Sequence, residues 1–162
     1  MSAVLDHHSA ELRLQAMTED WLDEVSRVEK RAYTHPWSRG NFADSLRAGY
    51  CAQVLLQGPT LMGYHVLMLG AQEAHLLNLT VDPPHQGRGL ARLMLDEMLR
   101  DARAQGAQSL WLEVRTSNVR ARQIYERYGF KSVGLRRNYY PLAPFKREDA
   151  VVMSLPLAAA QP

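Results

Sequence analysis

The chain has 162 residues, of which 46% are hydrophobic and 22% charged, and a formal net charge of +2 at pH 7. This composition indicates one globular domain and excludes a nucleic-acid-binding protein that works through a strongly basic surface. Cys51 is the only cysteine, which excludes an internal disulfide and favours a reducing, cytoplasmic compartment. We expect neither a signal peptide nor a membrane span, since no apolar run approaches about eighteen residues.

The first half of the chain predicts four strands and two helices. Strands are expected where apolar residues dominate or alternate with polar ones, over 11–17, 50–57, 61–69 and 74–81. The turn at 58–60 makes the second and third of these a hairpin, and two prolines end the fourth. Helices are expected where apolar residues recur at helical spacing, over 18–33 with Thr18 as N-cap and from Ser38 to Leu46.

The second half predicts two helices and three strands. The first helix follows a glycine-rich turn and ends at Gly106. The second begins at Asn118 and has Gly129 after its end. Strands are expected over 109–115, 131–140 and 149–156. The order of elements indicates one mixed α/β sheet with helices on its faces, over residues 11–157, with disordered ends at 1–10 and 158–162.

The turn before the third predicted helix reads Gln86-Gly87-Arg88-Gly89-Leu90-Ala91. The first N–H groups of a helix have no partner within it, and the helix dipole adds partial positive charge there, so such a site attracts phosphate. Gly87 and Gly89 allow a close approach of the backbone, and Arg88 and Arg92 add charge. Neither GxGxxG nor GxxxxGK(S/T) is present, which excludes two common nucleotide loops. A flexible helix start would explain the glycines equally well.

The sequence resembles the GNAT N-acetyltransferases, in which the pattern Q/R-x-x-G-x-G/A binds the pyrophosphate of acetyl-CoA. The motifs that carry the resemblance stand in the family's order: "HPWS", "LTVDP", "QGRGLA", "LWLEVRTSN", "IYERYGF", "RRNYYP" and "REDAVVMSLP". They are similar to the RimI-like branch, which acetylates the N-terminal α-amine of a small-subunit ribosomal protein. The resemblance covers residues 11–157 and implies a mostly antiparallel sheet of six to seven strands with about four helices.

The resemblance also implies how acetyl-CoA is held. A strand that splays from its neighbour would bind the pantetheine arm through backbone groups, and the glycine turn would bind the pyrophosphate. Asn118 would contact the cofactor, although a helix N-cap is an equally good reading of this residue. The implied cofactor residues are Leu79, Thr80, Val81, Gly87, Arg88, Gly89, Leu90, Ala91, Arg92 and Asn118.

The reaction needs a base for the attacking amine and an acid for the departing CoA thiolate. The resemblance places the base at Glu113 and the acid at Tyr125. Strand alternation puts Glu113 on the face opposite Leu112 and Val114, and we expect partial burial to raise its pKa toward neutrality. Without the resemblance, Glu113 would be read as an outward-facing strand residue and Tyr125 as a core aromatic.

Trp37, Tyr139 and Tyr140 would line the acceptor side, although aromatic rings next to a proline could equally form a packed corner. Phe145 and Lys146 depart from the small, polar residues usual in this acceptor-side loop of the family. We expect no metal site, membrane contact or direct nucleic-acid contact. Two other functions stay open: a GNAT enzyme that acetylates lysine or a small amine, and a non-catalytic acyl-CoA-binding module.

Overall fold

The computed structural model describes residues 11–157. The predicted disordered ends, 1–10 and 158–162, lie outside the described residues. The described elements are β1 Leu12–Ala16, η1 Glu19–Trp21, α2 Leu22–Ala32, α3 Arg39–Arg47, β2 Cys51–Gln57, β3 Thr60–Leu69, β4 Glu73–Val81, η2 Pro83–His85, α4 Leu90–Ala104, β5 Ser109–Arg115, α5 Val119–Tyr128, β6 Lys131–Ala143 and β7 Lys146–Pro156, where η1 and η2 are 3-10 helices.

The strands form one seven-stranded sheet in the order β1-β2-β3-β4-β5-β7-β6. β4 and β5 pair in parallel, whereas the pairs β1–β2, β5–β7 and β6–β7 are antiparallel. With its four α-helices, this sheet confirms the predicted mixed α/β class. The chain divides into two compact units, and the boundary between them passes through β3 and β4.

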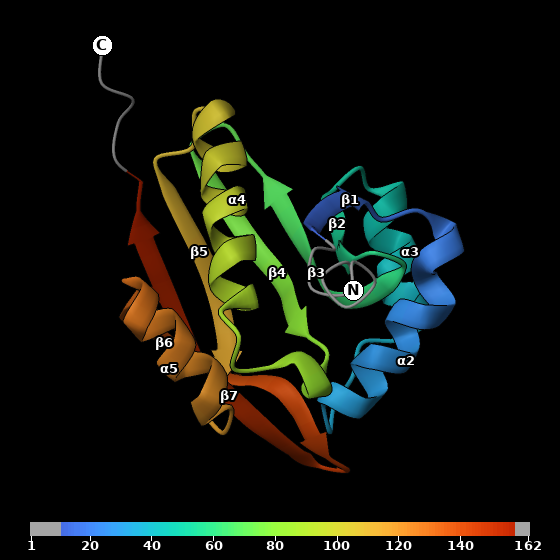
Figure 1. The fold of residues 1–162 in the computed structure, drawn as a ribbon. Helices are drawn as coiled ribbons and strands as arrows, with labels where there is room; N and C mark the ends of the chain where they lie inside the picture. Colours follow the sequence, from blue (N-terminus) through green and yellow to red (C-terminus); the bar gives the residue numbers. More distant parts are fainter. Residues whose placement is uncertain (1–10, 158–162) are drawn as a thin grey trace. The chain divides into compact units, whose positions relative to one another are not determined.

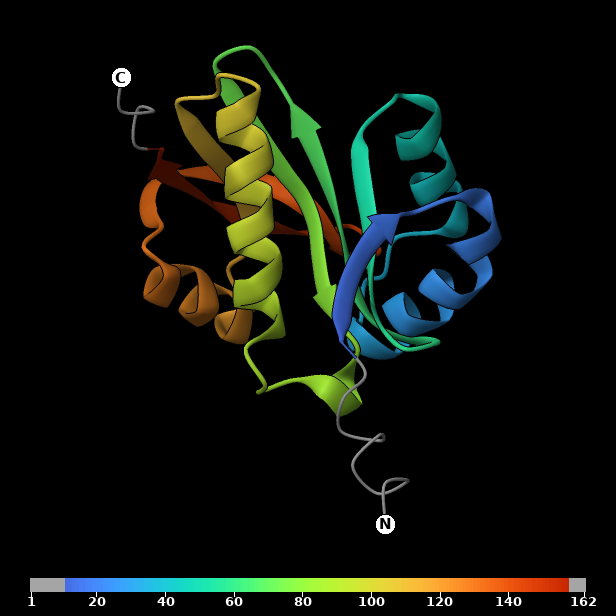
Figure 2. The ribbon, with the colours of Figure 1, turned by 45° about the horizontal axis from the view of Figure 1, so that its top comes forward.

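The first unit comprises residues 11–66 and 78–90. In Figures 1 and 2, α2 and α3 lie beside each other next to strands β1 and β2. Val25 of α2 and Phe42 of α3 are fully buried in its core. The Ser38 hydroxyl accepts a hydrogen bond from Asn41 N at 3.1 Å, and the Asn41 side chain accepts one from Ser38 N at 2.9 Å. This reciprocal capping box confirms the predicted start of α3 at Ser38.

The second unit comprises residues 67–77 and 91–157. α4 runs along β5 (Figures 1 and 2). Met94 and Met98 of α4 and Leu110 and Leu112 of β5 are almost completely buried, so both elements contribute to the core of this unit. Gly106 has a φ of +85°, the left-handed conformation predicted for the end of α4.

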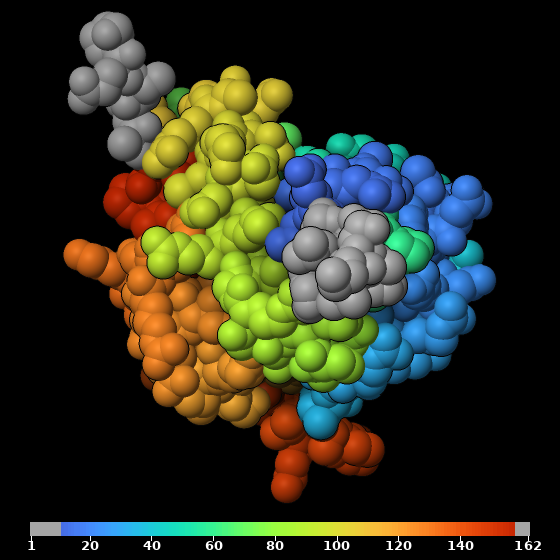
Figure 3. All heavy atoms as spheres, viewed as in Figure 1, coloured from blue at the N-terminus to red at the C-terminus, as the bar shows by residue number. Residues whose placement is uncertain are grey.

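Two sequence-based predictions need correction. Thr18 makes no side-chain cap, because a 3-10 turn over Glu19–Trp21 precedes α2 and changes the geometry of the helix start. The last two strands are longer than the predicted 131–140 and 149–156, because β6 continues to Ala143 and β7 begins at Lys146, where the two residues pair in a tight β-hairpin. Phe145 occupies the turn with a φ of +64°, because a tight hairpin turn needs left-handed backbone. Figure 3 shows the atoms of this tip projecting from the second unit.

Candidate active site

The turn before α4 has the backbone that the predicted phosphate site requires. Gly87 and Gly89 have φ values of +79° and +77°, and a Cβ added at either would meet no protein atom within 4 Å. The backbone therefore borders open space at the position where the unpaired N–H groups of α4 begin. Arg88 and Arg92 are both exposed. This geometry fits an anion such as a pyrophosphate.

The carboxyl-terminal part of β4 belongs to the first unit and contains Leu79, Thr80 and Val81. The register of β4 with β5 ends at the pair Leu76–Leu112, whereas β4 itself continues to Val81. The Tyr33 hydroxyl donates to Leu79 O at 3.0 Å and lies 2.8 Å from Thr80 Oγ1. Burial raises the pKa of Tyr33 to about 12, so this phenol stays protonated as a donor.

A buried carboxylate connects this strand to the loop that carries Trp37. Glu29 Oε2 accepts a hydrogen bond from Trp37 N at 2.9 Å, and Oε1 accepts from Tyr64 Oη at 2.7 Å and from Asn78 Nδ2 at 3.2 Å. Burial raises the pKa of Glu29 even though these donors oppose the effect. The Trp37 ring packs on Phe42 with 5.1 Å between the ring centroids. Trp37 is therefore a half-buried, anchored aromatic, and nothing local in the sequence indicated Glu29 as its partner.

Glu113 lies in the second unit, where β5 shows the predicted alternation of buried and half-buried residues. Its Oε2 is hydrogen-bonded to His75 Nε2, and its Oε1 accepts from Arg136 Nε at 3.2 Å. Burial raises the pKa of Glu113, but the interactions with His75 and Arg136 outweigh burial and lower the pKa below its usual value. The predicted rise in pKa is therefore wrong, because two cationic or hydrogen-bond-donating partners come from β4 and β6.

Tyr125 and Asn118 both belong to α5. Tyr125 is 8% exposed, and its ring meets Phe130 edge to face at 5.6 Å, so it contributes to the core. The Asn118 side chain accepts from Ala121 N at 3.2 Å and caps α5. Tyr125 is thus a core aromatic and Asn118 a helix N-cap, as expected of each without the family resemblance. Neither excludes a further role, which stays a prediction for each residue.

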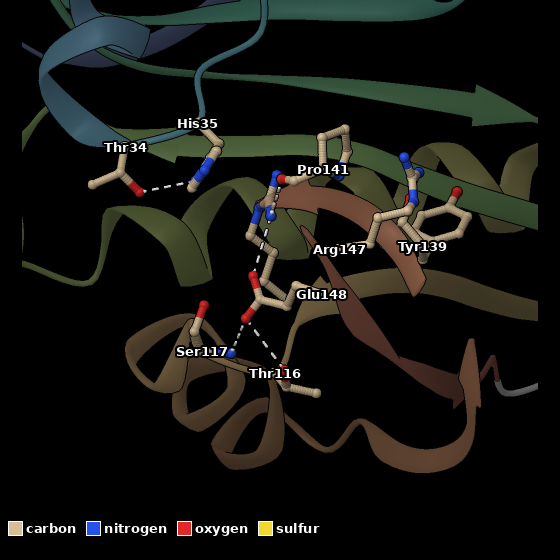
Figure 4. A network of polar contacts seen from close by, with 9 residues as sticks. Thr34, His35, Thr116, Ser117, Tyr139, Pro141, Arg147 and Glu148 are labelled. Atoms are coloured by element: carbon tan, nitrogen blue, oxygen red, sulfur yellow. Dashed lines mark hydrogen bonds and ion pairs between the residues drawn. The ribbon is translucent and has the colours of Figure 1, made fainter. Parts of the chain in front are cut away.

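A second buried carboxylate, Glu148 of β7, holds the turn that precedes α5 (Figure 4). Glu148 Oε2 accepts from Ser117 N at 2.8 Å and from Thr116 Oγ1 at 3.2 Å, and Oε1 accepts from Arg115 Nη1 at 3.1 Å. Burial raises the pKa of Glu148, but the three donors outweigh burial and bring it to about 2. Glu148 belongs to the "REDA" motif, but no local pattern in the sequence indicates its bonds to the turn before α5.

Arg115 extends this network to the predicted acceptor residues. Its Nη1 also donates to Pro141 O at 3.0 Å, and its guanidinium lies 4.4 Å from the centre of the Tyr140 ring. Tyr139 meets Tyr140 edge to face at 4.8 Å, and the Arg136 guanidinium lies 5.7 Å from the Tyr139 ring. The second unit therefore brings both predicted tyrosines into one connected cluster, in which Arg136 also binds the candidate base.

The described part of the chain contains no group of three or more histidine, cysteine, aspartate or glutamate residues that could hold a metal ion. Among residues 11–157, no helix is long and apolar enough to cross a membrane.

Residues 12–130 match the acetyltransferase (GNAT) family. The chain is 38% identical over 137 residues to the ribosomal protein bS18 alanine N-acetyltransferase of Escherichia coli K12. These residues make up 85% of this chain and 92% of that protein. The structure of this chain resembles the crystal structure of the ribosomal-protein-S18-alanine N-acetyltransferase from Escherichia coli, with a TM-score of 0.82 and 34% identity. The match covers 93% of this chain and 97% of that chain. Arabidopsis thaliana Naa50 in complex with the bisubstrate analogue CoA-Ac-MVNAL shares the fold, with a TM-score of 0.75, 20% identity and coverage of 89% and 97%.

Proposed function

Because the chain belongs to the GNAT acetyltransferase family, we propose that it transfers the acetyl group of acetyl-CoA to the N-terminal alanine of ribosomal protein bS18. The family resemblance inferred from the sequence is confirmed by these matches. The choice of bS18 as the acceptor is supported mainly by the 38% identity to the bS18 enzyme of Escherichia coli over 92% of that protein.

The proposed binding site for acetyl-CoA uses mainly backbone groups. The turn with Gly87 and Gly89 and the start of α4 would bind the pyrophosphate, since there is open space where either glycine would carry a Cβ and the first N–H groups of a helix attract phosphate. The backbone of residues 79–81 would hold the pantetheine arm, because β4 continues beyond its register with β5. Asn118, fixed as the cap of α5, would present its remaining polar atoms to the cofactor. Acetyl-CoA supplies the thioester carbonyl that the amine attacks.

Glu113 is the proposed base, and its lowered pKa restricts how it works. It is ionised at neutral pH, and proton transfer to it from an α-ammonium group with a pKa near 7.8 is more than about a thousandfold unfavourable. We therefore propose that Glu113 accepts a proton only after the amine has begun to attack the thioester. A neutral amine attacks, its nitrogen gains positive charge as the N–C bond forms, and Glu113 accepts the acidified proton directly or through a water.

This chemistry favours an α-amine over a lysine. At pH 7.4 roughly a quarter of α-amines are neutral, against about one lysine in a thousand, given their ordinary pKa values. A lysine acceptor would call for a free positive charge to lower its pKa. Arg115 is a poor candidate, because Glu148 binds it and balances its charge.

Tyr125 is the proposed acid, which would give its phenolic proton to the CoA sulfur as the C–S bond breaks. Trp37, Tyr139 and Tyr140 are proposed to contact the acceptor peptide. Trp37 is anchored through its backbone N–H to Glu29, and the Tyr140 ring is held by Arg115. Each aromatic ring would thus be placed before the peptide binds, which reduces the entropy lost on binding.

The test uses one peptide that begins with the bS18 alanine and contains an internal lysine. After incubation with acetyl-CoA, tandem mass spectrometry should find the acetyl group on the α-amine and little on the lysine. The same peptide with a blocked N-terminus is the control. Modification of the lysine at an unchanged rate after blocking would assign the protein to lysine or small-amine acetylation. Protection of the fold by CoA without thiol release in the presence of any of these peptides would indicate a binding module.

A further inference from the structure

The contact between His75 and Glu113 links two neighbouring parallel strands. His75 lies opposite Trp111 in the register of β4 and β5, two residues before Glu113 on the same face of β5. The side chains of His75 and Glu113 are 27% and 9% exposed, so the bond between Nε2 and Oε2 is largely shielded from water. The other partner of Glu113, Arg136, is 55% exposed and is therefore a looser constraint.

The chemistry of the pair fixes which atom carries the proton. The carboxylate of Glu113 is ionised at neutral pH and can only accept hydrogen bonds. His75 Nε2 must therefore carry a hydrogen and donate it. An ionised carboxylate can accept about four hydrogen bonds, so the bonds from His75 and Arg136 leave lone pairs for a water or an amine.

We propose that His75 is a positioning residue for the acetyl transfer, holding Glu113 through Oε2 so that its remaining lone pairs accept the proton of the attacking amine. This inference rests on the proposed role of Glu113 as the base. In the step itself, the N–H bond of the amine breaks and an O–H bond forms on Glu113, while His75 keeps its Nε2 hydrogen. The proton then passes from Glu113 to solvent after the product leaves.

The described groups that lower the pKa of Glu113 are His75 from β4 and Arg136 from β6. The Tyr140 phenol, also from β6, is close enough to respond to the charge of Glu113. Burial and the neighbouring Tyr139 and Glu113 raise the pKa of Tyr140, so this group stays neutral over the working range of pH. His75 and Arg136 are thus the two groups whose removal should change the titration of Glu113.

The test compares His75→Gln with His75→Leu, since the glutamine amide keeps a donor near the position of Nε2 and leucine keeps only the bulk. The first readout is the titration of the Glu113 carboxyl carbon by 13C NMR, which needs no acceptor. The second is kcat/KM for the peptide together with KM for acetyl-CoA. Glu73→Gln is the matched control, because Glu73 lies on the same face of β4 and makes no described bond to Glu113.

We expect His75→Leu to raise the pKa of Glu113 and to lower kcat/KM by about 10- to 100-fold, the range found when a residue that orients a metal ligand is lost. KM for acetyl-CoA should stay unchanged. His75→Gln should keep kcat/KM within about threefold of wild type, and Glu73→Gln should change neither readout. Equal kcat/KM for the leucine and glutamine variants, with an unmoved titration, would overturn the inference. Full activity of Glu113→Gln would instead overturn the proposed base, so the two failures are distinct.

Discussion

Replacing Glu148 by glutamine should destabilise the second unit by removing a charge that three donors need. A pKa lowered from 4.5 to about 2 corresponds to about 3 kcal/mol of native-state stabilisation. Solvent screening of the partly exposed donors reduces the expected loss to about 2 kcal/mol. The glutamine oxygen can still accept from Ser117 N, but its NH2 group would face Arg115, another donor.

The pH dependence of this loss separates the charge from simple packing. Because the native pKa of Glu148 is depressed, its stabilisation is complete above the unfolded pKa of about 4.5 and is lost as the pH falls toward about 2. The difference in unfolding free energy between wild type and Glu148→Gln should therefore be about 40% smaller at pH 3.5 than at pH 7.

Urea unfolding at pH 7, 5 and 3.5, followed by circular dichroism, measures both quantities. Glu126→Gln is the control, an exposed carboxylate on α5 whose removal should change the unfolding free energy by less than about 0.5 kcal/mol. A loss for Glu148→Gln that is the same at all three pH values would refute the reasoning, since a steric defect does not depend on protonation.

Three further predictions concern the proposed chemistry. In wild type, log(kcat/KM) should fall with a slope of one from pH 7 to pH 5 as the attacking amine becomes protonated, because Glu113 stays ionised over this range. A slope of two beginning near pH 6 would contradict a lowered pKa of Glu113. Gly89→Ala and its control Gly49→Ala should each lower the free energy of unfolding by about 1 kcal/mol, because both glycines have left-handed φ and open space around Cβ. Only Gly89→Ala should also lose the rise in Tm that CoA gives. Tyr125→Phe should lower kcat about 100-fold or more with little change in Tm. The control Tyr128→Phe, also on α5, loses a bond to Asp96 of α4 and should keep kcat; the reverse pattern would make Tyr125 a core residue alone.

The sequence alone determined the features that depend on neighbouring residues. The hydroxyl of Ser38 and the amide of Asn41, three positions later, cap α3 by a local rule, and the structure contains both bonds. Alternation over 109–115 placed Glu113 opposite the buried face of β5. The left-handed Gly106 at the end of α4 was predictable because few other residues tolerate that backbone. The motifs that gave the family are likewise short segments whose order along the chain is visible in the sequence.

Only the tertiary structure decided the electrostatics of the candidate site. His75 is 38 residues from Glu113 in the sequence and Arg136 is 23 residues from it, and together they reversed the predicted direction of the Glu113 pKa. Glu148 likewise reaches residues more than 30 positions away. No local pattern indicates such partners, because sheet order and register bring them together. The charge state of a half-buried carboxylate depends on the donors that surround it in space, and those are fixed only when the strands have paired.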